Sequence, residues 1–332
     1  MDFRISVVIP VYNAEKYLTR AVESAVVISE VDEVLLVEDQ SPDDALKLCI
    51  ELSERYEKVK CLQHPDKRNH GAGASRNLGI INAKNPYIAF LDADDYYLKH
   101  RFEQDLKMFL EFEDCDGVYN AVGTEFNSRQ ARDSFYDKGF GYQETLTLTG
   151  SPAPDELFSV LFNLHPNISG QFHTNGITIK KELLTTTGLF NTQLRLRQDI
   201  HLWRRLAAYG NLYPGELVTP VSNRVIHDFN RMTVREDHEP YIDLWWKSLN
   251  QIFKQNPLNT GKMKVFSESY TNHKIERSRN KFVALRYLLE SMLYMPELMV
   301  KSYGSFDFNF WKVFGKNRFT LRIISFKNRL FS

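Results

Sequence analysis

The chain has 332 residues, of which 43% are hydrophobic and 25% charged, which is enough apolar material for a packed core. This composition excludes a disordered, collagen-like or disulfide-scaffold protein. The 42 basic and 42 acidic residues give a net charge of zero. No global positive field would therefore hold nucleic acid through its phosphates, and we expect no nucleic-acid partner.

Cysteine usage and hydropathy indicate the compartment. Cys49, Cys61 and Cys115 are an odd number without a Cys-x-x-Cys pair, which fits a reducing compartment and disfavours a structural zinc site. The N-terminal apolar run is shorter than a signal peptide requires, and no stretch approaches the roughly 20 apolar residues that span a bilayer. We expect a cytoplasmic protein, free or peripheral on the inner face of the cell membrane.

The first half of the chain alternates between strand-like and helix-like hydrophobic patterns. Short apolar runs predict strands at 5–9, 34–37, 59–62, 87–91 and 117–122. Helical periodicity predicts helices over 14–25, 45–52, 74–83 and 98–112. Asn13 is the predicted N-cap of the first helix, and Ser41 with Asp44 resembles a capping box for the second. Repeated strand–helix–strand units predict an α/β fold with a mostly parallel central sheet flanked by helices.

Ligands of such sheets bind beyond the carboxyl ends of the strands, so the polar residues there are the candidates. The densest group is Asp92-Ala93-Asp94-Asp95, directly after a buried strand. Carboxylates this close repel one another unless a cation compensates, and Mg²⁺ or Mn²⁺ favours such ligands together with phosphate. An isolated Asp-x-Asp is most often a solvated turn or N-cap, but its position at a strand end favours a metal site.

Two further segments lie at the same predicted edge. Glu38-Asp39 ends the second strand, where a carboxylate could accept a hydrogen bond from a uracil or guanine ring N–H; a plain helix cap is the alternative. Gly71-Ala72-Gly73 opens a helix, and helix N-termini favour anions, although glycine-rich loops are more often simple turns. The glycine pattern of a dinucleotide site is absent after the first strand.

Four segments occur in order along the chain: 5–13 (Ile-Ser-Val-Val-Ile-Pro-Val-Tyr-Asn), 37–41 (Val-Glu-Asp-Gln-Ser), 74–80 (Ala-Ser-Arg-Asn-Leu-Gly-Ile) and 90–95 (Phe-Leu-Asp-Ala-Asp-Asp). Together they resemble glycosyltransferase family 2, the inverting GT-A enzymes that transfer sugars from nucleotide sugars. The resemblance covers about residues 4–120 and resumes over 188–206. It fades between 124 and 172 and after about 235. It implies a Rossmann-like GT-A fold.

The resemblance also implies roles for the matching residues. Asp199 corresponds to the general base. The implied nucleotide pocket consists of Pro10, Val11, Tyr12, Glu15, Asp39, Asn77, Asp92 and Ala93. Asp94 is the implied ligand of Mn²⁺ or Mg²⁺, and His227 can reach the metal or the diphosphate. The residues alone favour a simpler interpretation of Asp199, a carboxylate stabilised by the dipole at a helix N-terminus, whereas for His227 a structural role and a role as ligand are equally supported.

The chain departs from the family pattern at two places, beside Asp39 and beside Asp199. Glu38, before Asp39, stands where the family usually has an aspartate. Gln40, after Asp39, stands where a glycine or asparagine is usual. Gln198 stands where an acidic residue usually precedes the base, which removes a like charge beside Asp199 but leaves the base itself in place.

The expected function is inverting transfer of a sugar from a nucleotide-sugar donor, UDP-linked, to a hydroxyl of a glycan or lipid-linked glycan acceptor, as in bacterial surface polysaccharide synthesis. The alternative is a non-catalytic nucleotide-sugar-binding module, which would keep Asp39 and the Asp-x-Asp but lack Asp199. A phosphatase or receiver would need a nucleophilic aspartate where Pro10-Val11-Tyr12 stands.

We predict a catalytic domain over 1–235, with a nucleotide-binding half at 1–123 and an acceptor-side half at 124–235, and a helical C-terminal region over 236–332. Residues 163–176 suggest a long loop that could close over substrate. The tail, 301–332, holds seven basic, one acidic and nine aromatic residues, which suits a membrane interface. Peripheral membrane contact through 301–332 is a hypothesis; packing on the catalytic domain or a homo-oligomer contact is the alternative.

Overall fold

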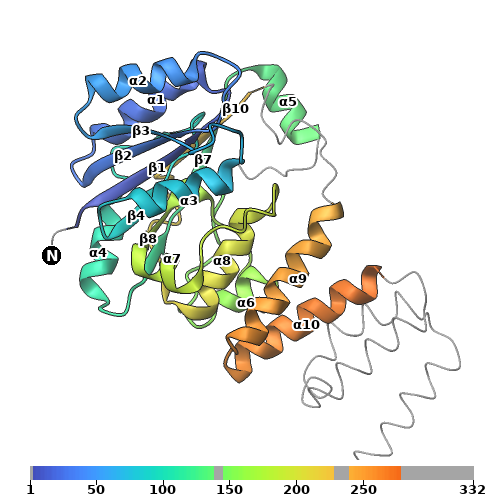
Figure 1. Cartoon of the computed structure of the whole chain (residues 1–332). Helices are drawn as coiled ribbons and strands as arrows, with labels where there is room; N and C mark the ends of the chain where they lie inside the picture. Colours follow the sequence, from blue (N-terminus) through green and yellow to red (C-terminus); the bar gives the residue numbers. More distant parts are fainter. Residues whose placement is uncertain (1–2, 138–144, 228–238, 278–332) are drawn as a thin grey trace, which may run out of the picture. The chain divides into compact units, whose positions relative to one another are not determined.

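A computed structural model describes residues 3–137, 145–227 and 239–277 (Figure 1). The chain divides into two compact units, Met1–Gln255 and Asn256–Ser332. The predicted domain boundary at 235 and the tail 301–332 both lie outside the described residues. The domain boundary and the membrane contact of the tail therefore stay predictions. In the described part of the chain, every helix is too short or too polar to cross a bilayer.

The first unit is built on a seven-stranded mixed sheet with the order β3-β2-β1-β4-β8-β6-β9. Its strands are β1 (Ile5–Val11), β2 (Val31–Glu38), β3 (Val59–Gln63), β4 (Tyr87–Phe90), β6 (Gly117–Tyr119), β8 (Ile177–Lys180) and β9 (Leu212–Pro214). Most pairs are parallel, as the sequence predicts, but β8 runs antiparallel to both β4 and β6. The predicted α/β fold is confirmed.

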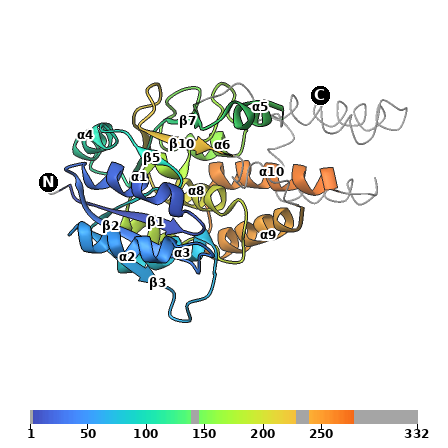
Figure 2. The same ribbon diagram turned by 90° about the horizontal axis from the view of Figure 1, so that it is seen from above.

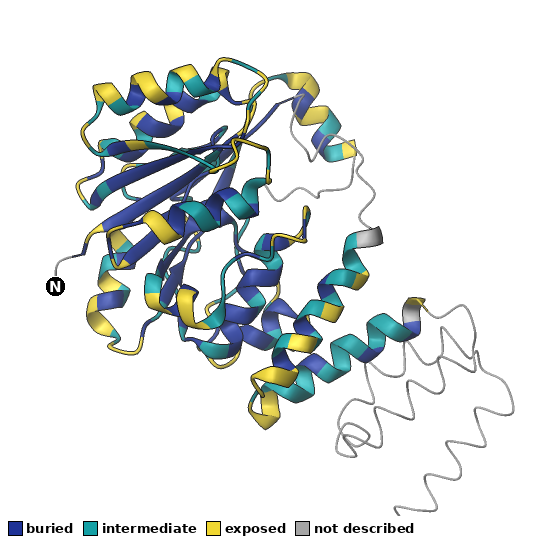
Figure 3. Cartoon of the chain, in the orientation of Figure 1, coloured by how far each residue is buried: buried dark blue, intermediate teal, exposed yellow. Residues whose placement is uncertain are grey.

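Helices cover both faces of this sheet. They are α1 (Glu15–Val26), α2 (Ala45–Arg55), α3 (Ala72–Asn82), α4 (Glu103–Glu111), α7 (Lys181–Thr187) and α8 (Gln198–Tyr209). In Figure 1, α1 and α2 lie above the strands and α3 below them. The central strands β1, β2 and β4 are almost entirely buried, whereas the outer sides of α1 and α2 are exposed (Figure 3).

The alternation of side chains along β1 explains why it is apolar on both faces. Val7 and Ile9 belong to one hydrophobic cluster with Leu18 and Val22 of α1. Val8 points the other way, against α3. A Cβ added at Gly79 would lie 2.3 Å from Val8 Cγ1, so only glycine lets α3 pack this closely on β1.

A second sheet has three strands, β5 (Tyr96–Tyr97), β10 (Ser222–Ile226) and β7 (Val122–Phe126), in the order β5-β10-β7. α5 (Arg129–Asp137) packs against β7 and β10 (Figure 2). The single strand predicted at 117–122 is wrong, because the chain leaves one sheet at Tyr119 and enters the other at Val122. The helix predicted from 98 begins only at Glu103, since Tyr96 and Tyr97 pair with β10.

The predicted helix caps are also wrong. Asn13 adopts a φ of 52° and does not cap α1, and Ser41 and Asp44 do not form a capping box. Instead, Asp43 accepts hydrogen bonds from the backbone N–H of Glu15 (2.9 Å) and of Ala45 (3.3 Å). One carboxylate therefore serves the starts of both helices, because the two loops lie side by side at the carboxyl edge of the sheet.

The remaining elements of the first unit are α6 (Leu157–Leu161), the 3₁₀ turn η1 (Thr174–Gly176) and α9 (Glu239–Gln255). α8 contacts α9 through His201, whose Nε2 lies 3.1 Å from Ser248 Oγ. In the second unit, the structure describes α10 (Thr260–Arg277).

Candidate active site

The acidic turn, Asp92–Asp95, leaves the carboxyl end of β4 as the sequence predicts. Asn175 holds both ends of it. The backbone N–H of Asp92 donates to Asn175 Oδ1 (3.0 Å), and Asn175 Nδ2 donates to Asp95 Oδ2 (2.6 Å). Asp95 Oδ1 also accepts the backbone N–H of Val225 in β10 (2.7 Å). Three elements, β4, η1 and β10, therefore meet at the turn.

The turn concentrates negative charge. Burial, and next the charges of Asp94 and Asp92, raise the pKa of the Asp95 carboxyl well above its ordinary range. Arg76 of α3 compensates part of this charge, because its guanidinium donates to Asp92 Oδ1 at 2.6 Å while almost fully buried. A further cation at the turn would relieve the remaining repulsion.

The structure brings the two predicted metal ligands together. His227 Nε2 lies 3.3 Å from Asp94 Oδ2, although the two residues are 133 positions apart. The ring of His227 stacks on Tyr17 of α1, with centroids 4.6 Å apart. Nearby, burial lowers the pKa of Arg224 to about 10, which leaves this side chain cationic at neutral pH.

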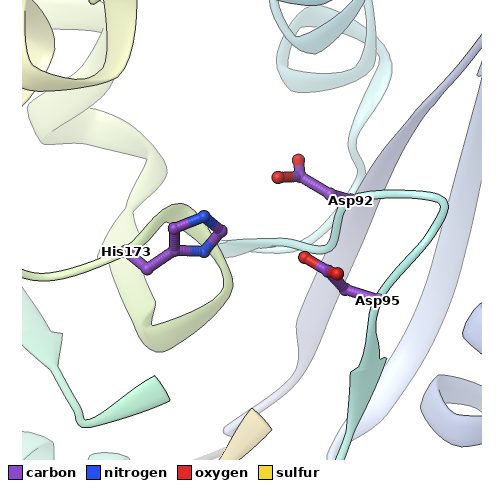
Figure 4. Close-up of side chains that lie close together, drawn as sticks. All are labelled: Asp92, Asp95 and His173. Carbon is purple, nitrogen blue, oxygen red and sulfur yellow. The ribbon is translucent and has the colours of Figure 1, made fainter. Parts of the chain in front are cut away.

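His173 lies beside the acidic turn, although the sequence did not identify it as a site residue. One ligand atom each from Asp92, Asp95 and His173 lie within 4.8 Å of one another, and the imidazole faces the two carboxylates (Figure 4). An octahedral cation about 2.1 Å from its ligands needs donors roughly 3–4 Å apart, so small side-chain movements would suffice. The carboxylate oxygens of Asp92 and Asp95 suit Mg²⁺ and Mn²⁺. The donor set therefore fits a divalent cation of this kind.

The hydrogen bond of His173 bears on its use as a ligand. Its Nδ1 accepts the backbone N–H of Asn175 (3.3 Å), which places the proton of the neutral ring on Nε2. A metal bond through Nε2 would need the other tautomer. The oxygen ligands of the turn are therefore the first candidates, with His173 beside them.

Asp199 lies in the first turn of α8, as predicted, and is half-buried. Its Oδ1 accepts the backbone N–H of Ile200 (2.8 Å). Burial lowers the pKa of His173, while the charges of Asp92 and Asp199 both act to raise it. The charges of the acidic turn and of the predicted base therefore both act on His173.

Gln198, next to Asp199, packs against the start of α3. A Cβ added at Gly73 would lie 1.9 Å from Gln198 Oε1. The absence of a side chain at Gly73 therefore leaves space for Gln198, the first residue of the helix that carries Asp199.

Asp39 has a structural use that the sequence did not reveal. Its Oδ1 accepts the backbone N–H of His70 and its Oδ2 that of Gly71, both at 2.7 Å, and the residue is almost fully buried. These bonds fix the loop that leads into α3. Glu38 likewise accepts from the Ser41 backbone N–H (2.5 Å) and from Gln63 Nε2 (2.8 Å).

Comparison with known proteins identifies the family. Residues 6–166 match the model of "Glycosyl transferase family 2". This part of the chain belongs to glycosyltransferase family 2. The sequence resemblance is thereby confirmed, on the part of the chain that holds β1 to β7 and the acidic turn.

Curated relatives are similar to part of this chain, which spans less than a fifth of the length of two of the three described below. An uncharacterised glycosyltransferase of Rickettsia felis is 40% identical over 111 residues, which are 33% of this chain and 18% of the relative. An uncharacterised glycosyltransferase of Rickettsia prowazekii is 24% identical over 255 residues, 76% of this chain and 73% of that protein. The minor teichoic acid biosynthesis protein GgaB of Bacillus subtilis is 36% identical over 113 residues, 33% of this chain and 12% of GgaB.

Solved structures show the same fold. Residues 1–349 of TarS from S. aureus, crystallised with UDP-GlcNAc, superpose with a TM-score of 0.61 at 18% identity, over 87% of this chain and 80% of that one. The same TarS fragment in a second crystal structure gives a TM-score of 0.58 at 18% identity, over 83% of this chain and 73% of that one. The first unit therefore has the GT-A fold expected of family 2.

The other family 2 nucleotide positions lie around the end of β1 and the start of α3. Val11 and Ala93 are buried, whereas Tyr12 is 49% exposed. The amide of Asn77 pairs with the backbone of Phe190 in both directions, at 2.9 Å each. Asn77 thus joins α3 to the segment before α8. Nucleotide contacts by these residues, and by Pro10 and Glu15, stay predictions.

Proposed function

We propose that the chain is an inverting glycosyltransferase that moves a sugar from a UDP-linked donor to a hydroxyl of a glycan or lipid-linked glycan acceptor. One observation carries the proposal: α3 contacts both parts of the site, because its Arg76 donates to Asp92 and its Gly73 packs against Gln198, the residue before Asp199. A metal-compatible carboxylate cluster and a separate half-buried carboxylate are the two parts that such a reaction needs.

The comparisons support the donor and the acceptor class. TarS, which shares the fold, was crystallised with UDP-GlcNAc and with UDP. GgaB, which is similar over 33% of this chain, is named for teichoic acid biosynthesis. Both favour a UDP-sugar donor and a cell-surface polymer as acceptor.

Mn²⁺ or Mg²⁺ is the proposed cofactor, held by Asp94 with His227, and by Asp92 and Asp95 with His173 beside them. When bound, the cation neutralises charge on the nucleoside diphosphate. Arg76 adds a donor there, because its Nε is buried without a hydrogen-bond partner in the described part of the chain. Arg76 would thus hold Asp92 with one nitrogen and offer another to a diphosphate oxygen.

Asp199 is the proposed base. Its position at the start of α8 leaves one carboxylate oxygen, Oδ2, outside the hydrogen bond to Ile200. That carboxylate would take the proton of the acceptor hydroxyl as the hydroxyl oxygen attacks the anomeric carbon and the bond to the diphosphate breaks. One base and one displacement invert the anomeric configuration.

A panel of UDP-sugars, tested for metal-dependent thermal stabilisation and for slow hydrolysis, checks the proposal. We expect one or a few donors to be both bound and hydrolysed, and chelator to remove both effects. Binding without hydrolysis or transfer would favour the alternative, a non-catalytic nucleotide-sugar-binding module. No binding of any nucleotide sugar would contradict both.

A further inference from the structure

Asn175 is completely buried, and both polar atoms of its side chain form hydrogen bonds to the acidic turn. Its Oδ1 accepts from the first residue of the turn, Asp92, and its Nδ2 donates to the last, Asp95. The turn closes on itself through the backbone N–H of Asp95, which donates to the carbonyl of Asp92 (3.0 Å). One amide therefore fixes both ends of a four-residue turn, and with them the direction of Asp94 between them.

Asn175 is itself held from the protein interior. Arg101 Nε donates to the Asn175 carbonyl (2.8 Å), and Arg101 Nη1 donates to Asp105 Oδ2 (2.8 Å). Arg101 and Asp105 are both fully buried. Asp105 also accepts from Thr178 Oγ1 and, at 2.7 Å, from Asn120 Nδ2. The buried Arg101–Asp105 ion pair therefore supports the acidic turn indirectly, through its hydrogen bond to Asn175.

Stability alone is a poor explanation for such an ion pair. Removing two charges from water costs several kcal/mol per ion, and apolar replacements of buried pairs are often as stable or more stable. What an apolar pair could not supply is a directed donor for the Asn175 carbonyl. We therefore attribute to this hydrogen-bond network the role of positioning Asn175.

We propose that Asn175 is a positioning residue, which sets the geometry in which the carboxylates of the acidic turn receive a divalent cation and the diphosphate. This inference rests on the proposed function. Partners behind a ligand set orient the ligands, and their loss typically weakens metal binding by about 10–100-fold. We expect a loss of that size from Asn175→Ala, although Asn175 itself is no ligand.

The test uses the full chain and measures Mn²⁺ binding with UDP present and no sugar donor, by electron paramagnetic resonance of free Mn²⁺. Asn85→Ala is the matched control, because Asn85 is also buried and hydrogen-bonded but precedes β4, whereas the acidic turn follows it. We expect the Mn²⁺ dissociation constant to rise at least tenfold in Asn175→Ala and to stay unchanged in Asn85→Ala, with both variants less stable than the wild type.

Arg101→Lys is a second variant should Asn175→Ala fail to fold. It keeps the charge opposite Asp105 but loses the guanidinium nitrogen that reaches the Asn175 carbonyl, so a rise smaller than that in Asn175→Ala is expected. An unchanged dissociation constant in the Asn175 and Arg101 variants, or an equal rise in Asn85→Ala, would overturn the positioning role. A wild-type chain that binds neither UDP nor Mn²⁺ would instead overturn the proposed function, and the positioning role with it.

Discussion

Asp199 is the single side chain from which we expect the largest catalytic effect. Asp199→Asn keeps the size of the side chain and an oxygen for the Ile200 N–H, but it cannot take a proton. Turnover should fall by about 10²–10⁴-fold with donor affinity unchanged. Steady-state kinetics and UDP-sugar titration check this. Glu182→Gln, an exposed first-turn acid of α7, is the control. An equal loss of affinity and turnover would point to a binding or folding role.

Asp39 is expected to matter for folding and for binding alike. In Asp39→Asn, one of the two backbone N–H groups, of His70 or Gly71, would face an amide N–H instead of an oxygen. An unsatisfied buried donor costs about 1–3 kcal/mol, so the free energy of unfolding should fall by that amount and UDP binding should weaken. Urea unfolding and UDP titration measure both, with exposed Asp44→Asn as control. An unchanged preference for UDP over CDP would remove Asp39 from the base pocket.

The sequence located the acidic residues of the site but not their partners. A carboxylate at a strand end is visible in the sequence, which is why Asp92 and Asp94 could be singled out, whereas Asp199 was found only through the family resemblance. The partners of Asp39 and Asn77 are backbone groups 31 and 113 residues away. His173 was missed for the same reason, since only the folded chain brings it to Asp92.

At the scale of elements, the start of α3 is packed tightly against the start of α8. Gly73→Ala would place a methyl group 1.9 Å from Oε1 of Gln198, which is buried, so the Gln198 side chain would have to move. Because Gln198 precedes Asp199, the displacement should move the base. A misplacement of about 1 Å can cost 10²-fold in rate, so we expect turnover to fall tenfold or more.

The double variant Gly73→Ala/Gln198→Ala checks this explanation, because it removes the obstructing side chain and should restore most of the activity. Gly261→Ala is the control, since a Cβ added there would be 3.6 Å from its nearest neighbour, an ordinary contact. A double variant as slow as Gly73→Ala would show that steric conflict with Gln198 is not the cause.

The elements that the sequence predicted well are those with an unambiguous local pattern. β1, β2, β3 and β4 are short apolar runs between amphipathic helices. β8 was missed because it is four residues long and antiparallel, and the hydrophobic pattern indicates burial without specifying a pairing partner. The split between β6 and β7 was missed because both segments are apolar, and only the folded structure separates them into two sheets.

At the scale of the molecule, His201 makes stability depend on pH. Burial, with the charges of Arg205 and Arg204, lowers the pKa of His201 to about 3, against about 6.5 in the unfolded chain. The unfolded state therefore binds the extra proton first, and stability is lost as the pH falls from 6.5 towards 3. One unit of pKa corresponds to 1.36 kcal/mol, so His201 alone should cost about 2 kcal/mol at pH 5.

Urea unfolding at pH 7 and pH 5, followed by tryptophan fluorescence, measures this cost. In His201→Asn, which does not titrate in this range, the fall in unfolding free energy between the two pH values should be smaller by about 2 kcal/mol. An equal fall in the two proteins would place the pH sensitivity elsewhere.

The bond between Asn175 and the acidic turn also has a consequence for biosynthesis. Asp92 and Asn175 are 83 residues apart, and chains are made at about 5–20 residues per second, so roughly 4–17 s pass between the synthesis of one and the other. Through that interval β1 to β4 have all been made, while β8 and η1 have not. A nascent chain that ends before residue 175 thus contains β1 to β4 and the acidic turn, but it lacks Asn175. The hydrogen bonds that hold the turn can therefore form only after residue 175 has been made.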